Sequence, residues 1–193
     1  MLETFREDLR AHREGLLAQG FWALTVYRFG HRRFRYSSWW VRKPWGALHL
    51  VLHKLCEIFF GISLHCRAEI GRRVQIEHFG GIIVHGNAVI GDDCLLRQGV
   101  SIGNKRPDRP LDAPRLGNGV NVGAGAKILG AVSVGDGAVV GANAVVLRDV
   151  PPRCLAVGVP AQVRPLDRTE EAEGAEEPEA GEHDAATRKA GPA

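Results

Sequence analysis

The pair Glu77-His78 interrupts a run of short apolar segments and contains the side chain best suited to chemistry. Histidine suits proton transfer near neutral pH because its ordinary pKa is about 6.5. His78 lies two positions after the apolar residue Ile76, at an expected turn, so its side chain is predicted to project outward. The residues alone leave two interpretations open. His78 is either a general base or a histidine that packs at a turn and hydrogen-bonds to a neighbouring segment.

The sequence gives less support to metal or thiol chemistry than to proton transfer by His78. His65, His78 and His85 are candidate zinc ligands, and a metal-dependent hydratase is one hypothesis for this chain. Neither a CxxC pair nor a zinc spacing occurs among the four cysteines, Cys56, Cys66, Cys94 and Cys154. The first residues are charged and lack the apolar core of a signal peptide. We therefore expect free thiols, no bound metal and a reducing, cytoplasmic compartment.

A period of six residues runs through positions 61–164 and must position His78. Every sixth residue from Leu64 to Val100 is apolar, and so is every sixth residue from Leu116 to Val146. Such a period fits neither a helix nor a simple alternating strand. It is typical of a solenoid in which three six-residue units close one triangular coil and the apolar residues stack inside. The period fails in a segment rich in proline and charge, which predicts an extended loop at 103–115.

Residues 1–60 are predicted to be helical, with breaks near Gly15 and Gly20 and a second helix that starts after Pro44. Charged residues and histidines interrupt the most apolar window, residues 45–62, so a buried or interfacial amphipathic helix is expected there rather than a membrane span. One apolar face of this helix is expected to carry Leu48, Leu52, Leu55 and Phe59.

The net charge is only +3, but it is distributed unevenly. Residues 1–60 contain ten Lys or Arg against five Asp or Glu, whereas residues 165–193 contain three against nine. The basic helices are a candidate for peripheral membrane contact, with an ordinary solvated helix face as the alternative; we expect no nucleic-acid partner. The acidic tail has few large apolar residues and is predicted to be disordered, with partner binding as the alternative.

Four stretches resemble the bacterial serine O-acetyltransferase family: AEIGRRVQIEHFGGIIV, VGAGAKILG, VGANAVVLRDVPP and AVGVPAQV. The likeness runs from about Gly61 to Val163, and GFWALTVYRFGHRR is similar to late N-terminal helices of that family. GISLHCRAEIGRR and RQGVSIGNK are similar to short acetyltransferases of exopolysaccharide synthesis, of the colanic acid type. The resemblance implies an all-β, left-handed parallel β-helix. We divide the chain into an N-terminal α-helical region (1–60), a β-helix acetyltransferase domain (61–164) and the tail (165–193).

The resemblance also assigns roles at the acceptor end of the site. His78 falls on the catalytic histidine, and Glu77 takes the place of an aspartate that helps bind the acceptor, with a surface role as the alternative. Ser63 stands where the family has the aspartate partner of the histidine. A serine hydroxyl can orient an imidazole but cannot balance the charge of an imidazolium. Asp112-Ala113 replaces an Arg-His pair that contacts serine in the family.

Arginines of the same loop are candidates to take over that contact. They are Arg106, Arg109 and Arg115, and Arg115 is included in the predicted acceptor site.

For acetyl-CoA, the matching residues are Gly123, Gly125, Ala126, Lys127 and Ala142. Small side chains there would let the pantetheine arm approach the backbone, with simple repeat packing as the alternative. Lys127 and Arg148 are candidates for the nucleotide phosphates.

The predicted activity is acetyl transfer from acetyl-CoA to a hydroxyl group. Two acceptors stay open: L-serine, which would open cysteine synthesis, and a sugar hydroxyl of an exopolysaccharide or glycolipid precursor. A hydratase of the γ-carbonic-anhydrase kind and a non-catalytic scaffold are the remaining hypotheses. The resemblance further implies a homotrimer with the active site between subunits, so that His78 faces the loop 103–115 of a neighbour.

Overall fold

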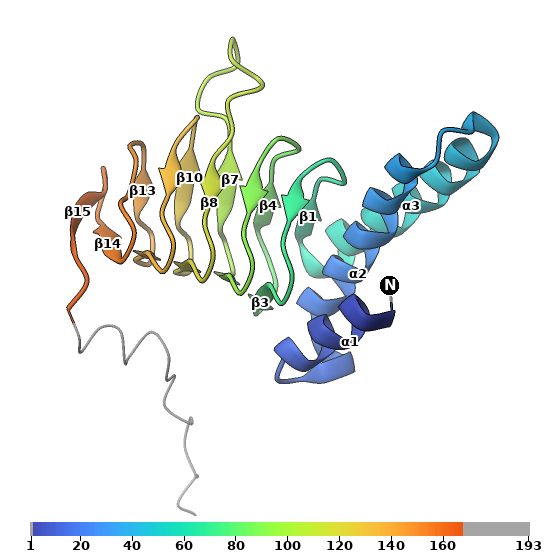
Figure 1. Ribbon diagram of the computed structural model, residues 1–193, viewed down its shortest axis with the longest axis horizontal. Coiled ribbons are helices and arrows are strands. Elements are labelled where there is room, and N and C mark those ends of the chain that lie inside the picture. The colour runs from blue at the N-terminus through green and yellow to red at the C-terminus, as the bar shows by residue number, and fades with distance from the viewer. Residues whose placement is uncertain (1, 168–193) are drawn as a thin grey trace, which may run out of the picture.

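A parallel β-solenoid forms the body of the molecule, with three helices at its N-terminal end (Figure 1). The computed structural model describes residues 2–167. The helices are α1 (Leu2–Ala11), α2 (Gln19–Arg32) and α3 (Trp39–Phe60), with 3-10 turns at Gly15–Leu17 and Arg33–Arg35. The strands are β1 (Ile62–Leu64), β2 (Glu69–Ile70), β3 (Gln75–Glu77), β4 (Ile82–Val84), β5 (Val89–Ile90), β6 (Leu95–Arg97), β7 (Ser101–Gly103), β8 (Arg115–Leu116), β9 (Asn121–Val122), β10 (Lys127–Leu129), β11 (Ser133–Val134), β12 (Val139–Val140), β13 (Val145–Val146), β14 (Cys154–Val157) and β15 (Gln162–Pro165).

Three sheets make the walls of the solenoid. Sheet A runs β1-β4-β7-β10-β13, sheet B runs β2-β5-β8-β11, and sheet C runs β3-β6-β9-β12-β14-β15. Each strand pairs in parallel with the strand one coil away, and only β15 pairs antiparallel, with β14. The parallel solenoid predicted from the period of six is therefore confirmed.

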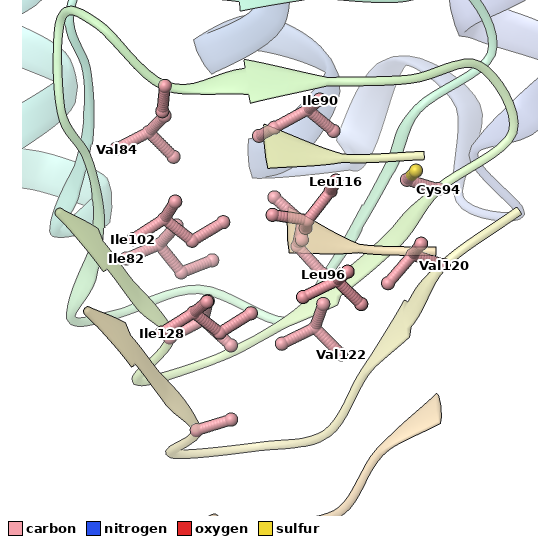
Figure 2. Packing of buried hydrophobic residues seen from close by; sticks show 14 of the residues in the cluster. Ile82, Val84, Ile90, Cys94, Leu96, Ile102, Leu116, Val120, Val122 and Ile128 are labelled. Carbon is pink, nitrogen blue, oxygen red and sulfur yellow. The ribbon is translucent and has the colours of Figure 1, made fainter. Parts of the chain in front are cut away.

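Apolar side chains fill the interior in columns, one column for each sheet. The column of sheet A passes through Leu64, Val84, Ile102 and Ile128, which are all buried. Figure 2 shows Val84, Ile102 and Ile128 along one wall of the coil, facing residues of the other two sheets. Short β-branched side chains suit this arrangement because each strand contributes only one or two inward positions.

The coil that carries His78 is longer than the regular coils. Ile62 pairs with Ile82, twenty positions away, whereas Ile83 pairs with Ser101, eighteen positions away. Two additional residues therefore lie in the corner between β3 and β4, residues 78–81. Beyond this corner, counting every sixth residue runs two positions ahead of the strand centres. The residues found by that count, Ile82, Ala88, Cys94 and Val100, are therefore buried at or near corners.

Helices α1 and α2 cover the open edge of the first coil. The hydroxyl of Tyr27 donates to the carbonyl of Ala68 at 2.7 Å and accepts the N–H of Ile70 at 3.1 Å. Burial raises the pKa of Tyr27 to about 12. His12 accepts the N–H of Ile76 at 3.2 Å. A buried N–H without an acceptor costs about 1–3 kcal/mol, so these contacts stabilise the first coil.

Helix α3 differs from its prediction in two ways. It starts at Trp39 and not after Pro44, because a proline near the start of a helix removes only one hydrogen bond. Its buried residues are His49 and Cys56, on the side that packs against α2. Three of the four residues expected on one apolar face, Leu48, Leu55 and Phe59, are exposed. This face is therefore not buried within the chain, and only the interfacial alternative stays open.

The predicted boundary between the solenoid and the acidic tail lies at the last strand. β15 ends at Pro165, one residue beyond the predicted limit at 164. Most of the predicted tail, residues 168–193, lies outside the residues that the structure describes.

Candidate active site

His78 lies at the corner between sheets C and A, immediately after β3. Its φ angle is 62°, a left-handed conformation that is uncommon for a residue other than glycine. The side chain is exposed, as expected for a residue at a turn. The imidazole of His78 is thus open to solvent at the corner that carries the two additional residues.

A column of glycines with positive φ follows the same corner from coil to coil, and we call it the glycine edge: Gly61, Gly81, Gly99 and Gly125, ending at Asn143. A Cβ on Gly99 would lie 3.2 Å from the Cα of Gly125, and a Cβ on Gly125 would lie 2.1 Å from Oδ1 of Asn143. Larger residues are excluded by both conformation and space. The glycine edge therefore keeps one long strip of backbone free of side chains, and it begins beside His78.

Glu77 belongs to a polar row on the outside of sheet C. It pairs in register with Arg97, whose Nε lies 3.3 Å from Oε2 of Glu77. Arg97 also donates to Oδ1 of Asn121 at 2.7 Å. Oε2 of Glu77 is buried and accepts no hydrogen bond from the described residues. Glu77 is thus a carboxylate that Arg97 partly neutralises through Oε2, next to His78.

Ser63 connects to a carboxylate that the sequence did not reveal. Its hydroxyl donates to Oε1 of Glu57 at 2.8 Å. Hydrogen bonds from Lys54 and then from Ser63 hold the pKa of Glu57 below its ordinary value, so this carboxylate stays ionised at neutral pH. The negative charge missing at Ser63 is therefore one hydrogen bond away, at the end of α3.

Ser63 and His78 flank the same corner. Gly61, two residues before Ser63, lies so close to Gly80 that a Cβ on it would be 3.0 Å from the Gly80 Cα. Gly80 follows His78 by two residues, and Ser63 pairs in register with Ile83 of β4, the strand that follows this corner. The fold thus places Ser63 in the strand next to the corner that carries His78.

The loop between β7 and β8 projects from the solenoid (Figure 1). It connects sheets A and B, whereas His78 lies between sheets C and A. Within the loop, Arg106 lies 3.0 Å from Asp108, and Arg109 lies 3.9 Å from Asp112. Arg115 is exposed at the start of β8. One chain does not bring Arg115 to His78.

The loop positions that replace the Arg-His pair carry no cation. Asp112 is paired with an arginine of the loop, and Ala113 is buried.

The residues predicted for acetyl-CoA divide into exposed and buried ones. Ala142 and Arg148 are exposed, and Gly125 lies on the glycine edge. Ala126 points into the core, its N–H donates to Gly123, and its carbonyl accepts from Ser101, so it serves packing.

Gly123 and Lys127 lie beside this strip. Gly123 is buried and donates to the carbonyl of Val140. The ammonium of Lys127 donates to the carbonyl of Gly99, one coil toward His78. In this conformation Lys127 is directed away from the coil of Ala142, which leaves Arg148 as the better phosphate candidate.

A hollow of about 290 Å³ lies beside Glu77 and His78, and Phe79, Arg13 and Glu14 are among its other lining residues. The sequence did not predict that the helical region contributes to this hollow. A larger cavity of about 480 Å³ lies between the helices and sheet B and contains none of the predicted site residues.

The described part of the chain gives no support to a metal centre. No three His, Cys, Asp or Glu side chains among residues 2–167 are grouped so that they could hold a metal ion. All four cysteines are free thiols, and burial raises the pKa of Cys94 to about 11. A thiol held in its protonated form is a poor nucleophile.

Two residues of the site escaped the sequence analysis. Glu57 is twenty-one positions from His78, in a helix, and Arg97 is one coil from Glu77. The twenty-residue spacing of Glu77 and Arg97 would have been the signal for the second, once the longer coil was recognised.

Comparison with known proteins agrees with the solenoid fold. Residues 113–148 match the model of the bacterial transferase hexapeptide family (six repeats). The serine acetyltransferase of Synechococcus elongatus is 36% identical over 84% of this chain and 68% of its own length. The serine acetyltransferase of Helicobacter pylori is 39% identical over 79% of this chain and 85% of its own length. For the Salmonella typhimurium enzyme, 40% identical, only 52% of its length is covered.

Solved structures give the same result. Soybean serine acetyltransferase in complex with serine superimposes with a TM-score of 0.75 at 37% identity, covering 84% of this chain and 68% of that one. A serine acetyltransferase in complex with CoA superimposes with a TM-score of 0.72 at 32% identity, covering 84% of this chain and 69% of that one. On the solenoid, its repeats and these relatives, the chain belongs to the serine acetyltransferase family.

Proposed function

We propose that this protein transfers acetyl from acetyl-CoA to the hydroxyl of L-serine. The observation that carries the proposal is that one edge holds both ends of the reaction: His78 stands at its start, and the small residues matched to the CoA site follow along it. Relatives named serine acetyltransferase, and neighbours solved with serine and with CoA, support the choice of both substrates.

The transfer is a direct one, in a complex of enzyme with both substrates. The Nε2 or Nδ1 atom of His78 takes the proton of the serine hydroxyl, and the oxygen attacks the thioester carbon. When the tetrahedral intermediate collapses, the C–S bond breaks and the proton on His78 passes to the leaving sulfur. The products are O-acetylserine and CoA. No cysteine of the chain takes part.

Glu57 supplies the charge that Ser63 lacks. In this arrangement the Ser63 hydroxyl orients the imidazole of His78 and is itself held by Glu57, whose negative charge favours the imidazolium during transfer. Both are positioning residues, since neither touches a reacting atom.

Glu77 holds the acceptor. Its carboxylate is a suitable partner for the ammonium group of serine, and Arg97, whose Nε lies 3.3 Å from Oε2, holds that carboxylate from the side.

The donor lies along the glycine edge, with the pantetheine arm against backbone and the phosphates near Arg148. The planar guanidinium of an arginine can bind a phosphate through two parallel N–H bonds.

The active site is completed by a second subunit of a homotrimer. Arg115 and the loop are remote from His78 in one chain, and the neighbouring copy would place them over the acceptor to grip its carboxylate. The cytoplasmic location stays a prediction from the sequence.

The experiment is an assay of CoA release with acetyl-CoA and L-serine, with O-acetylserine identified by mass. D-serine and L-homoserine are matched control acceptors. The absence of O-acetylserine under conditions in which a bona fide serine acetyltransferase is active would refute the proposal.

One observation favours a second acceptor class, a sugar hydroxyl. The loop positions that hold a cationic pair in the family carry Asp112, which is paired, and Ala113, which is buried. A sugar has no carboxylate to bind. Release of CoA with nucleotide sugars and not with L-serine would establish this alternative.

A further inference from the structure

Helix α3 exposes an apolar face along its whole length. Trp40, Leu50, Val51 and Ile58 are each more than half exposed, and Trp40 and Ile58 are both 72% exposed. The opposite side of the helix is packed: the ring of His49 fits against Gly30 of α2, and Cys56 is buried. Contiguous exposed apolar faces of this extent are rare in soluble proteins and indicate an interaction surface.

The segment that carries this face is basic. Residues 15–56 contain seven Lys or Arg and no Asp or Glu. Arg42 and Lys43 lie in the first turns of α3, next to the exposed Trp39 and Trp40, and the ammonium of Lys43 lies 4.4 Å from the centre of the Trp39 ring. Tryptophan together with Lys and Arg is the composition of segments that lie in the headgroup layer of a membrane.

Two other occupants fit less well. A second copy of the hairpin α2–α3 would bring two acid-free basic segments together, which Coulomb repulsion opposes. The acidic residues 168–193 match the charge, but they contain no Leu, Ile, Val, Met or aromatic residue that could cover an apolar face.

We propose that the exposed face of α3 docks on an anionic phospholipid surface. The apolar side chains enter the headgroup–acyl boundary, and Arg42 and Lys43 meet the lipid phosphates. The helix lies in the plane of the membrane because its other side is packed on α2. None of the described helices has a stretch both long and apolar enough to cross a bilayer. This proposal is independent of the acceptor that the enzyme uses.

The test is co-sedimentation of the full chain with vesicles of phosphatidylcholine alone and with about one third phosphatidylglycerol. We expect binding to the anionic vesicles, reduced by salt. Leu50→Ser with Ile58→Ser should weaken it by at least about tenfold, because both side chains would leave the apolar boundary. Arg42→Gln with Lys43→Gln should weaken it by roughly 25-fold at low salt, about fivefold for each charge.

The matched control is Leu16→Ser with Leu17→Ser, two residues of the same region that are 56% and 80% exposed but lie outside the hairpin. It should bind like the wild type. Light scattering and acetyl transfer are measured on every variant, so a loss of fold is recognised. The proposal is overturned if the wild type shows no preference for anionic vesicles or if the α3 variant binds equally well. It is also overturned if that variant instead lowers the oligomeric mass, which would assign the face to a second copy.

Discussion

The two ends of the glycine edge are built on different principles. At the proposed acceptor end, polar side chains would carry the function: Glu77 and His78 at the corner, with Ser63 and Glu57 beside it. At the proposed donor end, the small residues Gly125 and Ala142 leave the backbone open. A reaction centre needs groups of specific chemistry, whereas a long flexible arm needs space. Substitutions at the two ends should therefore change different kinetic constants.

The largest effect is expected for His78→Ala. Loss of a general base costs roughly 10²–10⁴ in kcat, and KM for acetyl-CoA should change little because the donor end is intact. The measurement is CoA release at saturating substrates. The control is His65→Ala, because His65 lies at another corner of the same coil. An equal loss of kcat in both variants would contradict the assignment of His78 as the general base.

The opposite pattern is expected for Gly125→Ala. The added Cβ meets Oδ1 of Asn143 and requires a positive φ, so the glycine edge is deformed where the arm would lie. KM for acetyl-CoA should rise at least about tenfold, on the scale of 1–2 kcal/mol. Gly119→Ala has a similar φ, but nothing within 4 Å of the new Cβ, and it lies at another corner. If both variants raise KM for acetyl-CoA equally, the cause is backbone strain at a positive φ and not a block of the donor site.

A smaller effect on kcat is expected for Ser63→Ala, about tenfold. Glu57→Gln should act in the same direction, and the double variant should lose little more, because both residues act through one hydrogen bond. Ser63→Asp should restore kcat without Glu57, since it puts the charge at the corner directly. Additive losses in the double variant would contradict the coupling.

The smallest effect is expected for Arg148→Gln, a three- to fivefold rise in KM for acetyl-CoA that disappears at high salt, because an exposed cation acts through a screened field. Arg153→Gln, an exposed arginine at a different corner of the solenoid, is the matched control. An equal rise in KM for both variants would show that the effect comes from the net charge of the protein and not from a contact of Arg148 with the phosphates.

The sequence predicted the solenoid well because one rule, an apolar residue every six positions, determines every coil. Its failures were local. The slip of two positions at residues 78–81 cannot be read from the apolar period, because Ile82, Ala88, Cys94 and Val100 continue it without a break.

Other features could not be read from the sequence. The partnership of Ser63 with Glu57 depends on the direction in which α3 enters the first coil. The buried side of α3 carries His49, whose pKa falls to about 4 through burial, and an apolar pattern cannot select such a face. Complementary packing against Gly30 determined it.

The glycine edge also sets the distance between the two ends of the proposed site. Stacked strands lie about 4.8 Å apart, so the three coil steps from His78 to Ala142 span roughly 14 Å. The reach of the donor arm is thus set by a count of coils and not by the fit of any single side chain. A chain lengthened by one regular coil of eighteen residues between the two ends would keep both sets of groups. It would still displace the thioester from His78 by the height of one coil, about 4.8 Å.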